Sequence, residues 1–406
     1  MLQHKAFYIS NTENKKQLLN NIISGVWFDD LDSLEGVLFS ELTLNAFIDK
    51  EIRYGRFDVQ TSTKNSLKNS SEGERKRALL NHILQFNPGY IILDNVFDCL
   101  DVEAQSKIES KLTELSKRIL IIQISARKRD ILSFIDNVYI LEDNRPKLFT
   151  TSTKVANINF TQDLPKPYIT INETFNPLIK LNKVSVSYGE RPIVNNISWI
   201  IKPGEFWQLI GPNGSGKSTI LSLISGDNPK GYMADMMLFG IKKGSGETVW
   251  DIKKNIGFYT SEILHGFKRK DSIESMIISG FFDSIGLYRQ PTDKQIAIAH
   301  KWLILLNMFH FKDKSFQFLS NGHKRLVLIA RAMVKHPSLL ILDEPTNGLD
   351  DTDAQLFSEL VNKIAKESNT AIIYVSHRKE EYIIPDFIYE LFPDKQGSKG
   401  KMIYTN

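Results

Sequence analysis

A glycine-rich segment in the second half of the chain has the residue types and the spacing that hold phosphate groups. It reads Gly-Pro-Asn-Gly-Ser-Gly-Lys-Ser-Thr over residues 211–219, follows the strand-like run 207–210 and precedes a helical pattern of apolar residues from Ile220. Glycines let a backbone curl around phosphate oxygens, and the N–H groups that open a helix attract anions. The segment therefore predicts a phosphate-binding loop of the Walker A type.

The side chains of this loop are suited to a nucleoside triphosphate with its magnesium ion. Lys217 is expected to reach the β and γ phosphate oxygens, and Ser218 to ligate Mg²⁺. The predicted nucleotide-binding residues of the loop are Gly211, Asn213, Gly214, Ser215, Gly216, Lys217, Ser218 and Thr219.

A pair of carboxylates follows the apolar run 339–342, which is typical of a buried parallel strand. Asp343 is expected to bind Mg²⁺, and Glu344 to polarise an attacking water. Together with the loop, this pair predicts an ATPase that uses ATP and Mg²⁺, with Lys217 and Glu344 as catalytic residues.

One spacing occurs twice in the chain, which indicates an internal repeat. In the second copy a serine precedes a proline and two aspartates by 17, 23 and 30 positions, and in the first copy the same three intervals recur. The residues are Ser320, Pro337, Asp343 and Asp350, and Ser71, Pro88, Asp94 and Asp101. Each copy has a helix-like pattern, a turn and a buried strand, so two α/β modules are predicted.

The length of 406 residues also favours two domains over one large domain. The segment 151–177 mixes Thr, Asn and Asp with three prolines and is predicted to be a linker. The predicted domains are therefore residues 1–150 and 178–406. Alternating apolar residues after Leu178 predict an antiparallel patch of strands ahead of the phosphate-binding loop.

Composition narrows the class of protein further. The formal net charge of +4 and the short, interrupted basic clusters do not support a nucleic-acid partner. A single cysteine, Cys99, excludes internal disulfides and cysteine-ligated zinc. The chain has no stretch of 18 apolar residues and no secretion signal, so a cytoplasmic location is expected.

The segment Leu319–His323, at a fixed distance before the second buried strand, resembles the signature sequence of ABC ATPases. The resemblance implies two P-loop ABC nucleotide-binding domains in tandem, each with a mostly parallel sheet core and a helical subdomain. It also implies that Tyr188 stacks on adenine and that His377 contacts the γ-phosphate as a third catalytic residue. Two departures are Ser261, where the family has glutamine, and the altered signature, in which Asn321 and His323 replace Gly and Gln.

The N-terminal copy is predicted to be a truncated, degenerate domain. Shifting the phosphate-binding loop back by 201 positions places Lys16 on Lys217 and leaves no glycine at the three glycine positions, which become Ser10, Glu13 and Lys15. Asn95 stands where Glu344 would be, and Ala126 where His377 would be. An asparagine cannot accept a proton from water, so rapid hydrolysis is not expected there.

ABC domains pair head to tail, so the resemblance implies two composite sites with crossed membership. The predicted active site combines Lys217, Ser218, Asp343, Glu344 and His377 with Ser71 and Gly73 of the N-terminal half. The other site combines Lys16, Asp94 and Asn95 with Ser320 and Gly322, and its predicted role is structural or regulatory.

The segments 244–254 and 278–288 resemble a narrower group, the bacterial molybdenum-transport-type tandem ATP-binding proteins. The resemblance implies a peripheral ATPase of a transport system, with a membrane permease as partner and a location at the inner face of the membrane. Two alternatives stay open: a soluble non-transport ABC ATPase, and a slow ATP-dependent switch acting on a nucleic-acid or protein complex. The sequence leaves the cargo and the homo-oligomeric state undetermined.

Overall fold

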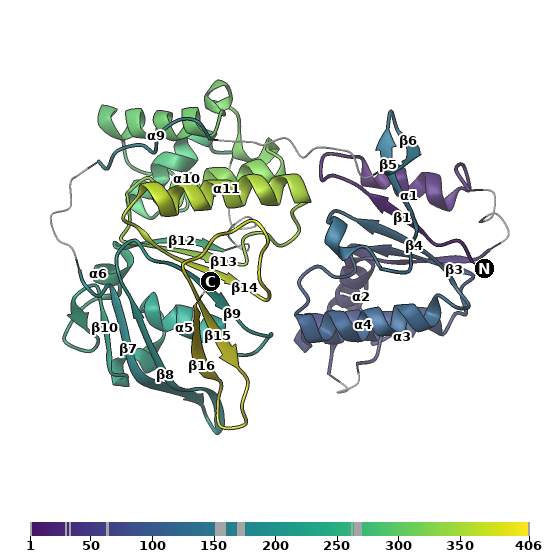
Figure 1. Ribbon diagram of the computed structural model, residues 1–406, viewed down its shortest axis with the longest axis horizontal. Coiled ribbons are helices and arrows are strands. Elements are labelled where there is room, and N and C mark those ends of the chain that lie inside the picture. Colours follow the sequence, from purple (N-terminus) through teal and green to yellow (C-terminus); the bar gives the residue numbers. More distant parts are fainter. Residues whose placement is uncertain are drawn as a thin grey trace. The chain divides into compact units, whose positions relative to one another are not determined.

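The computed structural model describes residues 2–28, 31, 34–61, 65–150, 160–168, 175–260, 263 and 270–404. The chain divides into two compact units. The first comprises Met1–Ala156 with Gly348–Thr352, and the second comprises Asn157–Asn347 with Asp353–Asn406. Both units are α/β, which confirms the predicted fold class (Figure 1).

The N-terminal unit is built on one six-stranded sheet with the strand order β2-β3-β4-β1-β5-β6. The strands are β1 (Lys5–Tyr8), β2 (Gly36–Phe39), β3 (Tyr90–Asp94), β4 (Leu120–Ser125), β5 (Asn137–Glu142) and β6 (Arg145–Leu148). The helices are α1 (Lys15–Ile23), α2 (Glu41–Tyr54), α3 (Glu72–Leu84) and α4 (Val102–Leu115), with short 3₁₀ turns at Leu67–Asn69 and Lys128–Asp130. All neighbouring strands are parallel except β6 on β5.

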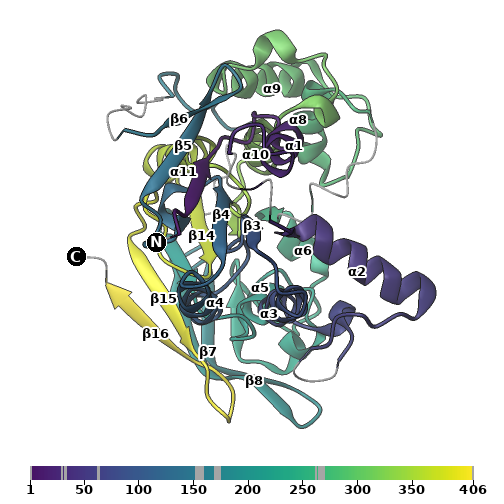
Figure 2. The same ribbon diagram turned by 90° about the vertical axis from the view of Figure 1, so that its right-hand side faces the viewer.

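Helices cover both faces of this sheet because its central strands are apolar on both faces. Alternate residues of β3 enter different cores: Ile91 packs with residues of α2, α3 and α4, whereas Ile92 packs with Leu18 and Ile22 of α1. Figure 2, which looks onto this unit, shows α3 and α4 on the other side of the sheet from α1. Between α1 and α3 the described chain forms only β2, α2 and a 3₁₀ turn, so this copy is the truncated one.

The C-terminal unit has a six-stranded sheet of order β12-β13-β14-β9-β15-β16 and a four-stranded antiparallel sheet of order β11-β10-β7-β8. Its strands are β7 (Ile179–Tyr188), β8 (Arg191–Ile201), β9 (Phe206–Ile210), β10 (Met236–Leu238), β11 (Ile241–Lys242), β12 (Ile256–Thr260), β13 (Leu339–Asp343), β14 (Ala371–Ser376), β15 (Phe387–Phe392) and β16 (Lys399–Tyr404). The antiparallel sheet confirms the patch predicted ahead of the phosphate-binding loop.

The helices of this unit are α5 (Lys217–Ile224), α6 (Val249–Lys253), α8 (Ile273–Ser279), α9 (Asp293–Leu305), α10 (Asn321–Met333) and α11 (Asp351–Glu367). Short 3₁₀ turns lie at Pro229–Met233, Gly280–Phe282, Phe309–Phe311 and Phe316–Phe318. Apolar residues of α5, such as Ile220 and Leu223, share one core with both sheets. Helices α8, α9 and α10 pack together and form the predicted helical subdomain (Figure 1).

A buried ion pair stabilises the turn between β11 and α6. Glu247 accepts hydrogen bonds from the backbone N–H groups of Gly244 (3.0 Å) and Ser245 (2.9 Å) and lies 2.9 Å from Lys243 Nζ. The two charged side chains are only 1% and 3% exposed. Burial alone would raise the pKa of Glu247, but the hydrogen bonds from Gly244 and Lys243 outweigh it and lower that pKa to about 2.

We expect Glu247→Gln to lower the free energy of unfolding by roughly 1–3 kcal/mol at pH 7, because the charged hydrogen bonds are lost. The folded pKa is about 2 and the ordinary value is 4.5, so the stabilisation is complete above pH 4.5 and disappears as the pH falls towards 2. Urea unfolding from pH 7 to pH 3 measures the difference. Glu190→Gln, in an exposed hairpin turn, is the control, and a pH-independent difference for Glu247→Gln would contradict the expectation.

Candidate functional site

The predicted phosphate-binding loop joins the end of β9 to the start of α5. Gly214 and Gly216 have φ of 77° and 95°, values that residues with a side chain rarely adopt. A Cβ atom on Gly216 would also lie 2.5 Å from Val194 Cγ1. Gly216 is the N-cap of α5 and provides no side chain to cap the first turn, which leaves this end of the helix suited to an anion.

Lys217, the first residue of α5, folds back over the loop. Its Nζ donates to the carbonyl oxygens of Gly211 (2.7 Å) and Pro212 (3.2 Å) and lies 3.4 Å from His377 Nδ1. The side chain is buried within the loop that it closes. A positive charge is thus held at the mouth of a helix N-terminus, where both attract phosphate.

Glu344 directly follows β13 and contacts His377, the residue that also lies next to Lys217. Its Oε1 lies 2.8 Å from His377 Nε2, and its Oε2 accepts a hydrogen bond from Asn347 Nδ2 (2.7 Å). Burial would raise the pKa of Glu344, but His377, Lys217 and Asn347 outweigh it and lower that pKa. Glu344 is therefore ionised at neutral pH and able to accept a proton.

The structure thus brings together three predicted catalytic residues, Lys217, Glu344 and His377. Ser218 lies in the first turn of α5, and Asp343 is the last residue of β13. A hydroxyl and a carboxylate are hard oxygen donors of the kind that Mg²⁺ accepts, and few protein ligands are needed because Mg²⁺ retains waters. The donor set therefore fits the predicted ion.

Of two further residues singled out in the sequence, Tyr188 is described by the structure and Ser261 is not. Tyr188 ends β7 and is 48% exposed, with its hydroxyl oxygen accepting a hydrogen bond from Asn228 Nδ2 (2.9 Å). Its ring is thus accessible at the end of β7, an inner strand of the antiparallel sheet. Ser261, which replaces the usual glutamine, lies outside the described residues.

A match to known proteins accompanies this geometry. A family model described as ABC transporter matches residues 194–347. The chain is 39% identical over 348 residues to the ABC transporter ATP-binding protein ModF of Escherichia coli strain K12, and the match covers 80% of this chain and 70% of that protein. The chain belongs to the ABC transporter ATP-binding protein family.

Other relatives of this ABC protein match it over different lengths. An uncharacterised ABC transporter ATP-binding protein of Schizosaccharomyces pombe is 31% identical, over 78% of this chain and 66% of that protein. The zinc import ATP-binding protein ZnuC of Yersinia pestis is 34% identical, over 49% of this chain and 70% of that protein. Membership confirms the predicted family and enzyme class, an ATPase of the ABC type.

The N-terminal copy of the loop corrects the predicted alignment by one residue. Tyr8 pairs with Ser125 as Ile210 pairs with Ser376, and α1 begins at Lys15 as α5 begins at Lys217. Lys15, and not Lys16, is therefore the counterpart of Lys217. The sequence shift of 201 was wrong because the N-terminal loop has no glycine to fix the register and either of two adjacent lysines, Lys15 and Lys16, can be aligned with Lys217.

The corrected register still leaves the N-terminal loop without glycine, because Ile9, Thr12 and Asn14 occupy the three glycine positions. The N-cap of α1 is now Asn14, whose side chain accepts a hydrogen bond from Gln17 N (3.1 Å). Glu13 also turns inwards, and its Oε2 accepts a hydrogen bond from Ser10 N (2.7 Å). The N–H groups of Ser10 and Gln17 are thus used by side chains of the loop itself.

Lys15 forms an ion pair with Asp94, the counterpart of Asp343. Burial raises the pKa of Asp94, and the charge of Lys15 opposes that rise. Asn95, the counterpart of Glu344, accepts a hydrogen bond from Ala126 N (3.1 Å) instead of facing a histidine. Lys15, Asp94 and Asn95 line a cavity of about 360 Å³.

The two signature serines have the same local role in their own units. Ser71 caps α3 and forms a capping box with Glu74, and Ser320 caps α10 through His323 N (3.3 Å). Gly73 lies in the first turn of α3, where a Cβ atom would lie 3.1 Å from Ala104 Cβ. The signature residues are thus held at helix N-termini in both units.

Sequence reasoning missed Asn347, which orients Glu344. The available signal was the motif Asp-Glu-Pro-Thr-Asn, in which an amide follows the acid by three residues within one turn.

We expect Gly216→Ala to weaken ATP binding by at least about tenfold, because the added Cβ strains a left-handed backbone and meets Val194. Equilibrium dialysis with labelled ATP measures the affinity. Asn14→Ala in the N-terminal loop is the matched control: it should cost about 1 kcal/mol of stability through loss of a cap and leave ATP affinity unchanged. The reverse result would place the nucleotide site in the N-terminal unit.

Proposed function

We propose that this ABC protein hydrolyses ATP at one composite site. The site combines Lys217, Ser218, Asp343, Glu344 and His377 of the C-terminal cassette with Ser71 and Gly73 of the N-terminal cassette. The observation that carries the proposal is the contact of Glu344 with His377 and of His377 with Lys217, for which the N-terminal unit has only Asn95, Ala126 and Lys15.

The role of each residue in this site follows from the charge and the chemistry of its side chain. Lys217 and the first turn of α5 bind the β and γ phosphates, with Tyr188 against the adenine and the remaining loop residues around the phosphates. Ser218 and Asp343 would hold Mg²⁺, which neutralises phosphate charge. Glu344 accepts the proton of the attacking water, and His377 keeps the Glu344 carboxylate oriented and contacts the γ-phosphate.

The assignment of Ser71 and Gly73 to this site rests on the unequal losses in the two halves. The N-terminal half has lost its phosphate-loop glycines, its general base and its histidine, yet it retains Ser71 and Gly73 at the start of α3. Retention of a signature in a half that has no nucleotide loop is understandable if that signature serves the loop of the other half. By the same reasoning the site of Lys15, Asp94, Asn95, Ser320 and Gly322 is structural or regulatory.

The corresponding domain assignment is a degenerate cassette at residues 1–150, a linker at 151–177 and an intact cassette at 178–406. In this proposal the two cassettes pair head to tail within one chain. The charge of the chain supplies no support for a nucleic-acid partner.

The protein partner that we propose is a membrane permease, which makes this chain the peripheral ATPase of a transport system at the cytoplasmic face. A cavity of about 320 Å³ in the C-terminal unit is lined by residues of α6, β12 and the helical subdomain. Trp250 and Ile285 on its border are 70% and 60% exposed, and these exposed fractions are high for apolar side chains. A short amphipathic helix of a permease fits such a groove.

Within the described residues, no helix has both the length and the apolarity needed to cross a membrane. The second candidate is a non-transport ABC ATPase or slow switch, favoured by the truncated N-terminal helical region, which would make docking on a two-fold permease uneven. Purification from native membranes, with Trp250→Glu as the variant, separates the two: loss of a co-purifying permease supports transport, and a soluble complex unaffected by the variant supports the second candidate.

We expect Glu344→Gln to reduce ATP turnover by about 10²- to 10⁴-fold, because the amide cannot accept a proton, while ATP affinity changes little. Steady-state phosphate release and equilibrium dialysis measure the two quantities. Asn95→Ala is the control and should retain full turnover. Equal turnover of Glu344→Gln and the unmodified protein would exclude Glu344 as the base.

The crossed arrangement predicts unequal effects of two matched variants. Ser71→Ala and Ser320→Ala each remove a helix N-cap and should each cost about 1 kcal/mol of stability. Only Ser71→Ala should reduce ATP turnover, by roughly tenfold or more, because only Ser71 serves the site with the general base. A loss confined to Ser320→Ala would contradict the crossed assignment.

A further inference from the structure

The proposed adenine contact, Tyr188, lies at the end of a hairpin that packs against the phosphate-binding loop. Tyr188 pairs with Arg191 where β7 turns into β8. Further along β8, Val194 lies so close to the loop that a Cβ atom on Gly216 would be 2.5 Å from it. Tyr188 itself is 48% exposed, so packing holds only part of its ring. The ring needs a second contact if it is to keep one position before a base binds.

That second contact comes from Asn228, which directly follows the turn after α5 and is only 3% exposed. Its Nδ2 donates to the hydroxyl oxygen of Tyr188 (2.9 Å) and to Ser222 Oγ (3.0 Å). Asn228 N also donates to Ser222 O (3.0 Å). Ser222 lies in α5, the helix that begins at Lys217, so the Asn228 amide joins the ring to the phosphate-binding helix.

The other partners of Asn228 fix the direction of its amide. The backbone N–H of Lys230 can only donate, and it donates to Asn228 Oδ1 (3.0 Å). The nitrogen of the amide must therefore face Tyr188 and Ser222. Ser222 Oγ donates its own hydrogen to Thr219 O (2.8 Å), so it accepts from Asn228. A buried amide that is fully paired in this way keeps one orientation.

These hydrogen bonds lead without a break from the ring of Tyr188 to the start of α5. They pass through Asn228 and Ser222 to Thr219, which follows the residues assigned to phosphate and Mg²⁺. The base and the phosphates of one nucleotide must be met at a set separation. Elements that already hold that separation lose less freedom when the nucleotide binds.

We propose that Asn228 is a positioning residue of the nucleotide site, which sets the place of the Tyr188 ring relative to α5. The inference rests on the proposed function, because it takes Tyr188 as the residue against adenine. The competing interpretation is that Asn228 serves only as the N-cap of the 3₁₀ turn Pro229–Met233. In that case the hydroxyl of Tyr188 has no effect on ATP binding.

Tyr188→Phe tests the proposal with the smallest change, because it keeps the ring and removes the hydroxyl that Asn228 holds. The Kd for ATP, measured by equilibrium dialysis with the full chain, should rise about three- to tenfold. The Kd for inorganic tripolyphosphate, which has no base, should stay the same. An unchanged Kd for ATP in Tyr188→Phe would overturn the proposal.

A double variant tests whether the two side chains act together. Asn228→Ala should raise the Kd for ATP by about the same factor as Tyr188→Phe, and the double variant should raise it no further, because both changes remove one hydrogen bond. Losses that multiply in the double variant would show independent effects and contradict the proposal. Thermal unfolding checks that Asn228→Ala is folded, and Tyr188→Phe decides the question alone if it is not.

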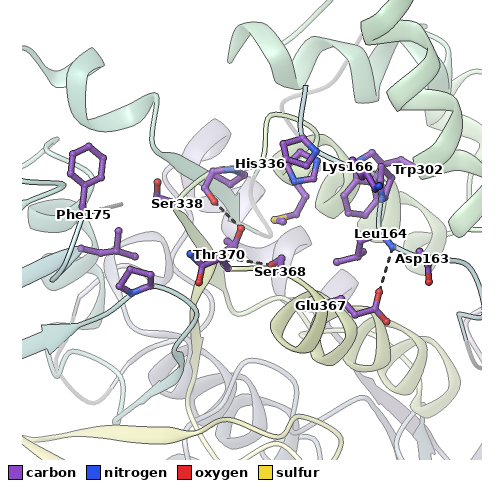
Figure 3. Close-up of a pocket in the computed structure, with 17 residues that line it drawn as sticks. Asp163, Leu164, Lys166, Phe175, Trp302, His336, Ser338, Glu367, Ser368 and Thr370 are labelled. Carbon is purple, nitrogen blue, oxygen red and sulfur yellow. Dashed lines mark hydrogen bonds between the residues drawn. The ribbon is translucent and has the colours of Figure 1, made fainter. Parts of the chain in front are cut away.

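Thr370→Val is the matched control, because it also removes one hydroxyl that makes one hydrogen bond. Thr370 is buried, and its Oγ1 donates to Pro337 O (2.8 Å). It directly precedes β14 and lines a cavity of about 650 Å³ (Figure 3), whereas the phosphate-binding loop follows the opposite, carboxyl end of the parallel strand β9. Thr370→Val should lower thermal stability and leave both dissociation constants unchanged. An equal rise in the Kd for ATP in Thr370→Val and Tyr188→Phe would trace the effect to general destabilisation and refute the positioning role.

Tyr188→Ala separates failure of this inference from failure of the proposed function. It removes the whole ring and should weaken ATP binding more than Tyr188→Phe does. Weaker binding in Tyr188→Ala with normal binding in Tyr188→Phe would mean that the ring meets the base without help from Asn228, so only the inference fails. Normal binding in both variants would remove the adenine contact from the proposed function as well.

Discussion

The parallel hydrogen bonding of β13, β14 and β9 is the constraint on which the site depends. In this ladder Asp343 pairs with Val375, and Ser376 pairs with Ile210, so the carboxyl ends of three strands meet at one edge. The residues that directly follow these ends are Glu344, His377 and Gly211. Segments 33 to 166 positions apart in sequence therefore deliver an acid, an imidazole and a phosphate-binding loop to one place, because strand register leaves them no other position.

Much of this arrangement could be predicted because the responsible residues lie within short motifs. The types of Lys217 and Glu344 and their places beside apolar runs indicated the fold class and a phosphate site, whereas the role of His377 was implied by the resemblance to ABC ATPases. The motif Asp-Glu-Pro-Thr-Asn places an amide three residues after Glu344, but the hydrogen bond of Asn347 to Glu344 depends on a turn geometry that the sequence does not specify. The signature serines also could not be placed relative to the site from the sequence, and their assignment to it stays a prediction.

The N-terminal half marks the limit of pattern reasoning. Its loop retains no glycine, so alignment to the intact copy depended on two adjacent lysines, and the wrong lysine was chosen. Strand pairing resolves the ambiguity because Tyr8 is fixed against Ser125. The consequence for chemistry is that the cation equivalent to Lys217 is paired with Asp94 in the N-terminal unit. Charge that would meet a phosphate is neutralised within the protein.

The residues that directly follow β3 and β13, Asn95 and Glu344, share a left-handed backbone conformation. Glu344 and Asn95 have φ of 47° and 43°, and each N–H donates to the neighbouring strand, at Val375 O and Ile124 O (both 3.0 Å). Asparagine adopts left-handed conformations more readily than glutamate does. The asparagine that stands in the N-terminal half, where it cannot accept a proton from water, therefore also fits this main-chain conformation more easily than a glutamate would. The C-terminal half has Glu344, which adopts this conformation less readily. Such a compromise is expected where catalytic need and local stability oppose each other.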